Sequence, residues 1–203
     1  MKAMFATDLK CGSCGASYSI TEKIAECDRC QGILEVEYDY NLMQNQFAKN
    51  DLNRERKGGL WRYAKALPVN PESIVTLGEG FTPLVQMRKI LAETKLMAKL
   101  DYVFPTSSFK DRGSTVVVSK ANELGASSVA IDSTGNAAAS VSAYAAKAGM
   151  PCYVFIPSHT ENEKVVQVSA AGATVVKVNG TRQDVHDVIE AAYREFELSL
   201  IHI

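Results

Sequence analysis

The sequence predicts an α/β fold in which a parallel sheet is covered by helices on both faces. Short apolar segments alternate with helical segments in the second half of the chain, and Gly125, Gly149 and Gly172 each stand between a helical segment and the next apolar one. These glycines are 24 and 23 residues apart, the length of a repeated strand-and-helix unit. Strands this apolar belong in a parallel sheet with helices on each side.

The first half of the chain is predicted to hold two smaller units. Residues 1–40 carry the paired cysteines and end in an alternating run over residues 33–40, which predicts a strand. Residues 41–75 are polar and are predicted to form one or two bridging helices or a linker. The run LGEGFTPLV, residues 77–85, is predicted as a loop that opens the main domain, residues 76–203.

The main domain is predicted to repeat strands and helices in regular order. We expect helices over 109–124, 137–148, 162–171 and 183–196, and strands over 127–132, 152–156 and 174–178. Right-handed crossovers place the loops that follow the strands at one edge of the sheet. Ligands bind at that edge, so the loops after Ile131, Ile156 and Val178 are the expected site.

Composition limits the classes of partner. The chain has 203 residues and a formal charge of −1, without a long basic run, which argues against nucleic acid. No apolar run approaches the roughly 18 residues that span a bilayer, and the N-terminus lacks a signal-peptide core. We therefore expect a cytoplasmic protein with a small-molecule substrate and neither a nucleic-acid nor a membrane partner. The oligomeric state is open, with a homodimer as one expectation.

Four of the five cysteines form two pairs with two-residue spacing, Cys11 with Cys14 and Cys27 with Cys30, and twelve residues separate the pairs. In a reducing compartment such pairs hold metal more often than they form disulfides. Four thiolates make a closed, structural site. The spacing predicts a zinc-ribbon-like module, with iron or metal-free thiols as alternatives. Cys152 stands in an apolar run and is predicted to be a small buried residue.

The run SSFKDRG places a lysine at a predicted helix start. Ser108 and Asp111 have the spacing of a capping box, which puts Lys110 in the first turn. The positive end of the helix dipole and Arg112 disfavour the protonated amine, and partial burial beside Phe109 acts in the same direction. A lysine with a lowered pKa is a better nucleophile toward an aldehyde. The alternative is a solvated surface lysine near Asp111.

The loop after the first predicted buried strand reads STGN. Ser133, Thr134, Gly135 and Asn136 offer hydroxyls, an amide and unobstructed backbone N–H groups at a helix start. Such a start suits a carboxylate or a phosphate. The alternative is an ordinary N-cap before a tightly packed helix, which needs only one of these residues.

The three histidines are scattered along the chain. His159, His186 and His202 lie far from one another in the sequence, and none is paired with a candidate nucleophile. We expect them at the surface or on helix faces.

Three motifs together resemble those of the fold-type II pyridoxal-phosphate enzymes. They are LGEGFTPL at 77–84, SSFKDRG at 107–113 and STGNAAAS at 133–140, and their order and spacing match over residues 74 to about 180. Within that group the chain is most similar to threonine synthases, many of which also begin with a short cysteine ribbon. The resemblance implies the tryptophan-synthase-β-like fold, a three-layer arrangement around a parallel sheet.

The resemblance also implies roles for particular residues. Lys110 would bond covalently to the aldehyde of pyridoxal 5'-phosphate, and Phe109 would pack against the cofactor region. Asn136 would hydrogen-bond the ring hydroxyl of the cofactor and contribute to the substrate site. Ser133 and Thr134 would bind the substrate carboxylate at the helix start.

The implied reaction converts O-phosphohomoserine and water into threonine and phosphate. The substrate would displace Lys110, and the freed amine would move protons at Cα and Cβ while phosphate leaves Cγ and water adds at Cβ. Asp111 and Arg112 would be scaffold around the lysine. The same motifs would serve a serine or threonine dehydratase or a cysteate synthase. A non-catalytic chain that acts as a binding module is a third alternative.

The end of the chain departs from the pattern of this family. Relatives carry a glycine-rich loop that grips the cofactor phosphate and a Ser or Thr that faces the pyridine nitrogen, both far beyond the lysine. Residues 180–203 contain no run of glycines. We therefore expect a truncated chain with an incomplete main sheet, which lacks activity by itself.

Overall fold

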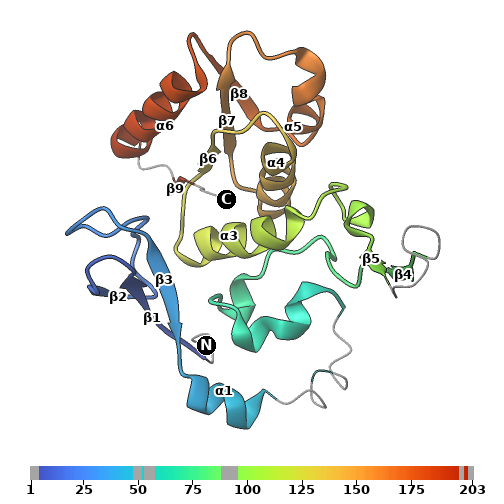
Figure 1. Ribbon diagram of the computed structural model, residues 1–203. Helices are drawn as coiled ribbons and strands as arrows, with labels where there is room; N and C mark the ends of the chain where they lie inside the picture. The colour runs from blue at the N-terminus through green and yellow to red at the C-terminus, as the bar shows by residue number, and fades with distance from the viewer. Residues whose placement is uncertain (1–4, 48–51, 53–57, 88–95, 197–198, 201–203) are drawn as a thin grey trace.

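The protein was analysed as a computed structural model that describes residues 5–47, 52, 58–87, 96–196 and 199–200 (Figure 1). The N-terminal part is a small antiparallel sheet, and the C-terminal part is a parallel sheet flanked by helices. Between them lies a connecting region with little regular structure.

The small sheet has the strand order β2-β1-β3 and is antiparallel throughout. Its strands are β1 (Ala6–Cys11), β2 (Ser17–Ser19) and β3 (Leu34–Tyr38). The strand predicted over 33–40 is therefore confirmed as β3, whereas β1 and β2 were not predicted. Helix α1 (Tyr40–Gln46) follows directly and is capped by the side chain of Asp39.

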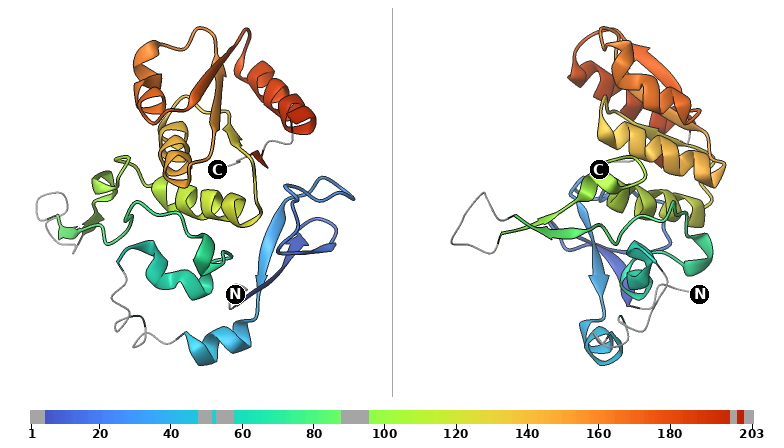
Figure 2. Two further views of the ribbon diagram at one scale, coloured as in Figure 1. Left: turned by 180° about the vertical axis from the view of Figure 1, so that it is seen from behind. Right: turned by 90° about the vertical axis from the view of Figure 1, so that its right-hand side faces the viewer.

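The connecting region contains short 3-10 helices and one β-hairpin. The helices are η1 (Leu60–Ala66), η2 (Pro71–Ser73) and η3 (Asp101–Val103), and the hairpin joins β4 (Leu84–Gln86) to β5 (Met97–Lys99). The hairpin projects away from the body of the protein (Figure 2). The predicted loop at 77–85 is confirmed as far as Pro83, after which the chain enters β4. Residues 48–51 and 53–57 of the predicted bridging segment lie outside the described residues.

The main sheet is parallel, as predicted, and has the order β8-β7-β6-β9. Its strands are β6 (Val129–Ile131), β7 (Cys152–Pro157), β8 (Thr174–Val178) and β9 (Ser199–Leu200). The predicted strands at 127–132, 152–156 and 174–178 are confirmed with small changes of boundary.

The helices of the main domain also follow the prediction. They are α3 (Asp111–Glu123), α4 (Asn136–Ala148), η4 (Asn162–Val165) with α5 (Val166–Ala170), and α6 (Arg182–Phe196). Gly125, Gly149 and Gly172 end α3, α4 and α5 with φ angles of 66°, 68° and 80°, which is the left-handed conformation that glycine favours. The single helix predicted over 162–171 is instead a 3-10 turn followed by a short helix. The two are separated at Val165, whose φ of −107° and ψ of 1° lie outside the α-helical region.

Both faces of the main sheet are covered, which is the predicted layer arrangement. Val129 and Ile131 of β6 pack in one cluster with side chains of α3 and α4. Between them in the sequence, Ala130 faces the other way and packs with Val185 and Ile189 of α6. This alternation explains why the strands are apolar on both faces. No helix within the described parts of the chain is both long and apolar enough to cross a bilayer.

Candidate active site

Lys110 stands at the N-cap of α3, one position before the first turn. Its backbone N–H donates to Ser108 Oγ at 3.2 Å, while the carboxylate of Asp111 accepts from the Thr106 N–H at 2.9 Å and from Ser140 Oγ at 2.5 Å. The predicted capping box between Ser108 and Asp111 is therefore wrong. The physical reason is that Asp111 turns inward, where it is fully buried and bonded to another helix.

The side chain of Lys110 is half-buried at the surface of this helix start. Its Nζ lies 5.3 Å from the ring centroid of Phe109, and Phe109 itself is 59% exposed. Among the residues that the structure describes, no carboxylate forms an ion pair with Lys110. The alternative pairing with Asp111 does not occur, because that carboxylate is occupied by Thr106 and Ser140. The amine is thus available to a ligand.

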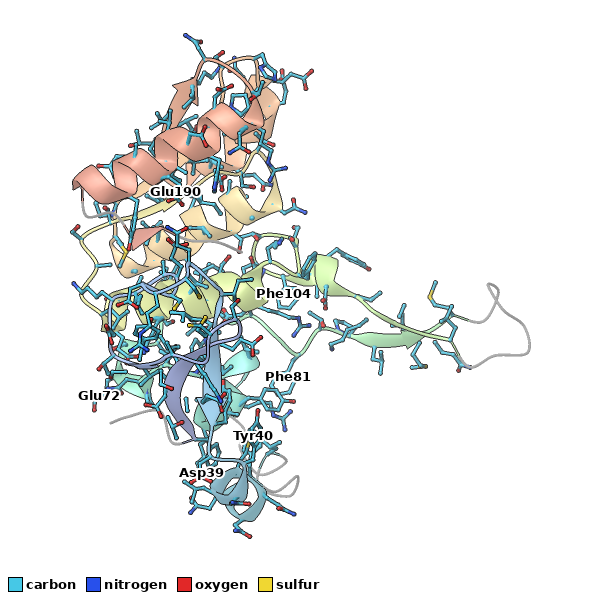
Figure 3. All side chains as sticks on the ribbon, turned by 60° about the vertical axis from the view of Figure 1, so that its left-hand side comes forward. Asp39, Tyr40, Glu72, Phe81, Phe104 and Glu190 are labelled. Atoms are coloured by element: carbon cyan, nitrogen blue, oxygen red, sulfur yellow. The ribbon has the colours of Figure 1, made fainter. Side chains whose placement is uncertain are left out.

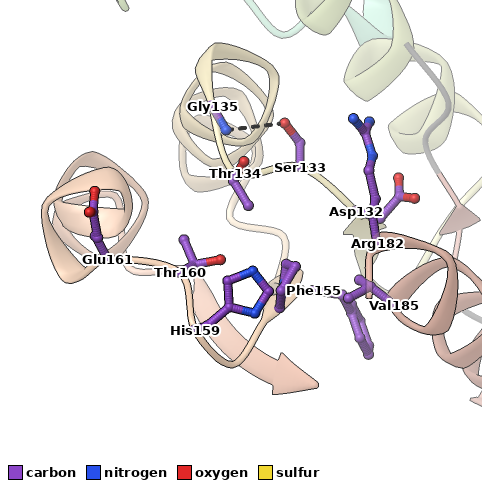
Figure 4. A pocket seen from close by; sticks show the side chains of 11 residues that line it. Asp132, Ser133, Thr134, Gly135, Phe155, His159, Thr160, Glu161, Arg182 and Val185 are labelled. Atoms are coloured by element: carbon purple, nitrogen blue, oxygen red, sulfur yellow. Dashed lines mark hydrogen bonds between the residues drawn. The ribbon is translucent and has the colours of Figure 1, made fainter. Parts of the chain in front are cut away.

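Helix α4 begins at Asn136 with an open N-terminus. Gly135 is the N-cap and has no side chain that could cap the helix, and its N–H donates to Ser133 Oγ at 3.3 Å (Figure 4). A Cβ placed on Gly135 would meet no atom within 4 Å, so the space in front of the helix is open. Thr134 and Asn136 are exposed at this position. Backbone N–H groups at such a start attract an anion.

A cavity of about 530 Å³ lies at the carboxyl edge of the main sheet (Figure 4). It is bounded by the loops that follow β6 and β7 and by the start of α6, which follows β8, so the segments after the three strands meet at one edge of the sheet. The lining residues are Asp132, Ser133, Thr134, Gly135, Phe155, Pro157, His159, Thr160, Glu161, Arg182 and Val185.

The structure brings only some of the predicted site residues to this cavity. Ser133 and Thr134 line it, whereas Asn136, Lys110 and Phe109 are not among its lining residues. The start of α3 nevertheless lies beside α4, because Asp111 bonds to Ser140. Ser140 is one helical turn beyond Asn136 and shares its face of α4.

Sequence reasoning missed several residues of the cavity. His159 is exposed, as expected, and it also lines the cavity together with Arg182. His186 on α6 lies 3.3 Å from the carboxylate of Asp132, which also lines the cavity. His202 lies outside the described residues. The available signal was position, because His159 and Arg182 follow the predicted strands at their carboxyl ends.

Arg112 turns away from the lysine toward the connecting region. Its guanidinium donates to the carboxylate of Asp101 at 2.9 Å and lies 4.6 Å from the ring centroid of Phe104. The hydrogen bond from Arg112 lowers the pKa of Asp101. Arg112 therefore links α3 to η3, and it does not line the cavity.

The four paired cysteines come together at one end of the small sheet. Their sulfur atoms all lie within 4.8 Å of one another, with Cys11 Sγ 3.5 Å from Cys30 Sγ and Cys14 Sγ 3.6 Å from Cys27 Sγ. A tetrahedral zinc ion with Zn–S bonds of about 2.3 Å needs sulfur atoms about 3.8 Å apart. The Tyr18 hydroxyl, 3.0 Å from Cys27 Sγ, is the main reason that the pKa of Cys27 is lowered to about 6. A thiolate is the form that binds metal.

The motifs of the main domain match a known family. The profile described as "Pyridoxal-phosphate dependent enzyme" matches residues 75–202. The chain belongs to this family. The match includes both helix starts and the cavity described above.

Two relatives match nearly the whole length of this chain. Threonine synthase of Methanocaldococcus jannaschii is 40% identical over 198 residues, which is 95% of this chain and 48% of that protein. Threonine synthase of Methanosarcina acetivorans is also 40% identical over 198 residues, covering 96% of this chain and 48% of that protein. The chain thus spans about half the length of these relatives.

Solved structures support the same fold. Serine racemase from Dictyostelium discoideum superimposes with a TM-score of 0.55 at 27% identity, covering 60% of this chain and 40% of that one. Maize serine racemase gives a TM-score of 0.55 at 27% identity and covers 60% of this chain and 38% of that one. The expected fold-type II architecture is therefore confirmed for the main domain.

The residues present fit the aldehyde end of the family's cofactor. The amine of Lys110, which pairs with no carboxylate of the described residues, stands at the start of α3, and an exposed amide, Asn136, stands at the start of the neighbouring α4. The uncapped backbone of α4 and the hydroxyls of Ser133 and Thr134 suit a carboxylate beside it. This donor set has the chemistry that an aldehyde and an amino acid require.

Proposed function

We propose that this chain is part of a threonine synthase, which converts O-phosphohomoserine and water into threonine and phosphate. The proposal is supported by the two relatives of that name at 40% identity and by six more at 35–37% identity over 145–152 residues. The observation that carries it is the pair of adjacent helix starts, one with Lys110, which forms no ion pair within the described residues, and the other with no side-chain cap.

In this proposal Lys110 is the amine that holds the cofactor and later moves protons. Pyridoxal 5'-phosphate, when bound, supplies an aldehyde for a covalent bond and a conjugated ring that accepts electrons from the substrate. Lys110 would hold the cofactor through that aldehyde, and its Nζ is the group that would take and return protons at Cα and Cβ of the substrate. Phe109 would pack against the cofactor region, and Asn136 would hydrogen-bond the ring hydroxyl.

Ser133 and Thr134 hold the substrate carboxylate against the start of α4. Their hydroxyls and the backbone N–H groups of the helix provide several donors for one carboxylate, and the helix dipole favours its charge. The position of the carboxylate sets the position of Cα and thus its distance from Lys110. Orientation of this kind is a large part of what a protein adds to a cofactor reaction.

We further propose that the four paired cysteines hold a structural zinc ion, so that residues 1–40 form a zinc-ribbon-like module. The four sulfur atoms leave no open coordination position, which makes the ion structural and not catalytic. Cysteines used for metal and not for disulfides are typical of a reducing compartment, which supports a cytoplasmic location.

The cofactor part of the proposal is tested by adding pyridoxal 5'-phosphate to the purified chain and to the longest product of its gene. A visible Schiff-base band that is lost in Lys110→Ala supports it. Lys120→Ala is the matched control, because Lys120 lies on the same helix and pairs with Glu123 at 2.9 Å. Equal bands in the two variants would contradict the role of Lys110.

The substrate part is tested separately by phosphate release. Release from O-phosphohomoserine with formation of threonine supports threonine synthase. Cofactor binding with ammonia release from serine or threonine, and no phosphate release, would indicate a dehydratase instead. A protein that never forms the Schiff-base band would indicate a non-catalytic chain.

A further inference from the structure

One face of α4 carries three polar residues at four-residue spacing. Asn136, Ser140 and Tyr144 therefore lie above one another along the helix. Asn136 is exposed at the helix start, while Ser140 and Tyr144 are fully buried. A buried hydroxyl needs a hydrogen-bond partner. Each of these two has a buried carboxylate as its partner.

The partner of Ser140 is Asp111, the residue that follows Lys110. The Ser140 hydroxyl donates to Asp111 Oδ1 at 2.5 Å, and the other oxygen of Asp111 accepts from the Thr106 N–H at 2.9 Å. The Thr106 hydroxyl also donates to Asp111. Within the described part of the chain, no cation pairs with this carboxylate. Its place is set by hydrogen bonds from two different elements.

These contacts make a short mechanical link between the two helix starts. One peptide bond joins Lys110 to Asp111, one hydrogen bond joins Asp111 to Ser140, and one helical turn joins Ser140 to Asn136. We infer that Asp111 is a positioning residue, which holds the Lys110 amine at the working distance from Asn136 by bonding to Ser140. The inference rests on the proposed function for the identity of the ligand, but the link itself involves only this chain.

A carboxylate suits this link better than an isosteric amide. Asp111 receives three donors on two oxygens, whereas an asparagine has one acceptor oxygen and an NH₂ group that would face another donor. Asp111→Asn therefore breaks at least one bond with almost no change of size. A larger or smaller residue at position 111 would also change the packing, so its effect could not be assigned to the lost hydrogen bond.

The chain offers matched controls for this link. Ser142 is on the same helix and is also fully buried, but its hydroxyl lies 3.8 Å from the sulfur of Cys152 and does not bond to Asp111. Glu79 is a second buried carboxylate, which bonds to Tyr144 at 2.8 Å and is not adjacent to the lysine. Ser140→Ala is thus compared with Ser142→Ala, and Asp111→Asn with Glu79→Gln.

The first measurement needs no cofactor. Lys110 and Lys120 are acylated in competition by a trace reagent, and the labelled peptides are quantified in each variant. In Ser140→Ala we expect the rate at Lys110 relative to Lys120 to change several-fold, with the wild-type ratio kept in Ser142→Ala. The same ratio in both serine variants would overturn the inference, whether or not Asp111→Asn folds.

The second measurement follows the Schiff-base band during titration with pyridoxal 5'-phosphate. We expect Ser140→Ala and Asp111→Asn to weaken binding by roughly tenfold, the effect of losing one buried hydrogen bond to a charged group. Ser142→Ala and Glu79→Gln should stay near the wild type. Equal affinities for Ser140→Ala and Ser142→Ala would again overturn the inference. If the wild-type protein forms no band, the proposed function fails, and the labelling ratio alone decides the inference.

Discussion

The Tyr144 hydroxyl donates a hydrogen bond of 2.8 Å to the carboxylate of Glu79, although the two residues are 65 positions apart. Both side chains are buried, and Glu79 also accepts from the Thr76 hydroxyl and from the Leu77 N–H. Phe81, in the same loop as Glu79, is labelled in Figure 3. The contact fastens the loop at 77–83 to the middle of α4. Burial and then the bond to Glu79 raise the pKa of Tyr144, so the hydroxyl stays a donor.

Tyr144→Phe should lower the free energy of unfolding by about 1–3 kcal/mol, because it leaves a buried carboxylate with one donor fewer. Urea denaturation followed by circular dichroism measures the change. Tyr153→Phe is the control, since Tyr153 on β7 is only partly buried and its hydroxyl forms no hydrogen bond with another described residue. Equal losses in the two variants would show that the ring, and not the hydroxyl, matters.

The ion pair of Asp101 with Arg112 predicts a pH dependence of stability. Hydrogen bonding from Arg112 lowers the pKa of Asp101 below its usual 3.8 in the folded state. The pair therefore stabilises the protein above about pH 4, and this contribution is lost as the pH falls through the lowered pKa. Both side chains are about one-third exposed, so the contribution should stay below about 1 kcal/mol.

Asp101→Asn tests this directly. The difference in unfolding free energy between wild type and variant should be largest at neutral pH and should shrink toward zero in acid. A difference that is constant with pH would mean that Asp101 acts through packing or neutral hydrogen bonds alone.

Much of the main domain could be predicted because its signals are local. A glycine that must adopt a left-handed conformation marks each helix end, and the apolar strands between them show that both faces of the sheet are covered. Right-handed crossovers then bring the strand-end loops together at one edge. For the same reason Ser133 and Thr134 could be placed at the cavity without knowledge of any contact.

The errors arise where contacts between distant segments decide the structure. The spacing of Ser108 and Asp111 fits a capping box, but Ser140, 29 residues further on, takes the carboxylate instead. The first two strands of the small sheet were missed because each is short and the cysteine turns interrupt their alternation. The β4–β5 hairpin was missed for a similar reason, since each strand has three residues.

The zinc proposal is tested by the metal content of cysteine variants. We expect one zinc ion per chain by elemental analysis, and its loss in Cys27→Ser, because three thiolates cannot close the tetrahedral site. Cys152→Ser is the control, since Cys152 is not part of the sulfur cluster. It is buried in the main domain, and burial raises the pKa of its thiol. Equal metal content in the two variants would contradict the zinc proposal.

Thr134 should affect the substrate and not the cofactor. Thr134→Val keeps the shape of the side chain but removes a donor at the open start of α4, so we expect KM for O-phosphohomoserine to rise about tenfold. The Schiff-base band should be unchanged. Thr160→Val, which changes another lining residue in the segment after β7, is the comparison. A loss of the band in Thr134→Val would mean that this residue holds the cofactor instead.

The close approach of Gly59 and Gly80 predicts that the loop before β4 tolerates no side chain there. The Leu60 N–H donates to the Glu79 carbonyl at 2.7 Å, and a Cβ on Gly80 would lie 2.6 Å from backbone atoms of Gly59. Gly80→Ala should therefore cost at least about 2 kcal/mol of unfolding free energy.

Gly78→Ala separates this effect from backbone strain alone. Gly78 has a φ of 87°, also in the left-handed region, but a Cβ there would meet no atom within 4 Å. Gly78→Ala should therefore lower the free energy of unfolding by only about 1 kcal/mol, the cost of placing an alanine in the left-handed conformation. Gly80 follows Glu79, so Gly80→Ala should also shift Glu79 and weaken its hydrogen bond to Tyr144. We expect the backbone amides in the middle of α4 to exchange faster as a result. Equal stability losses for the two alanine variants would show that the backbones can separate without disturbing the loop.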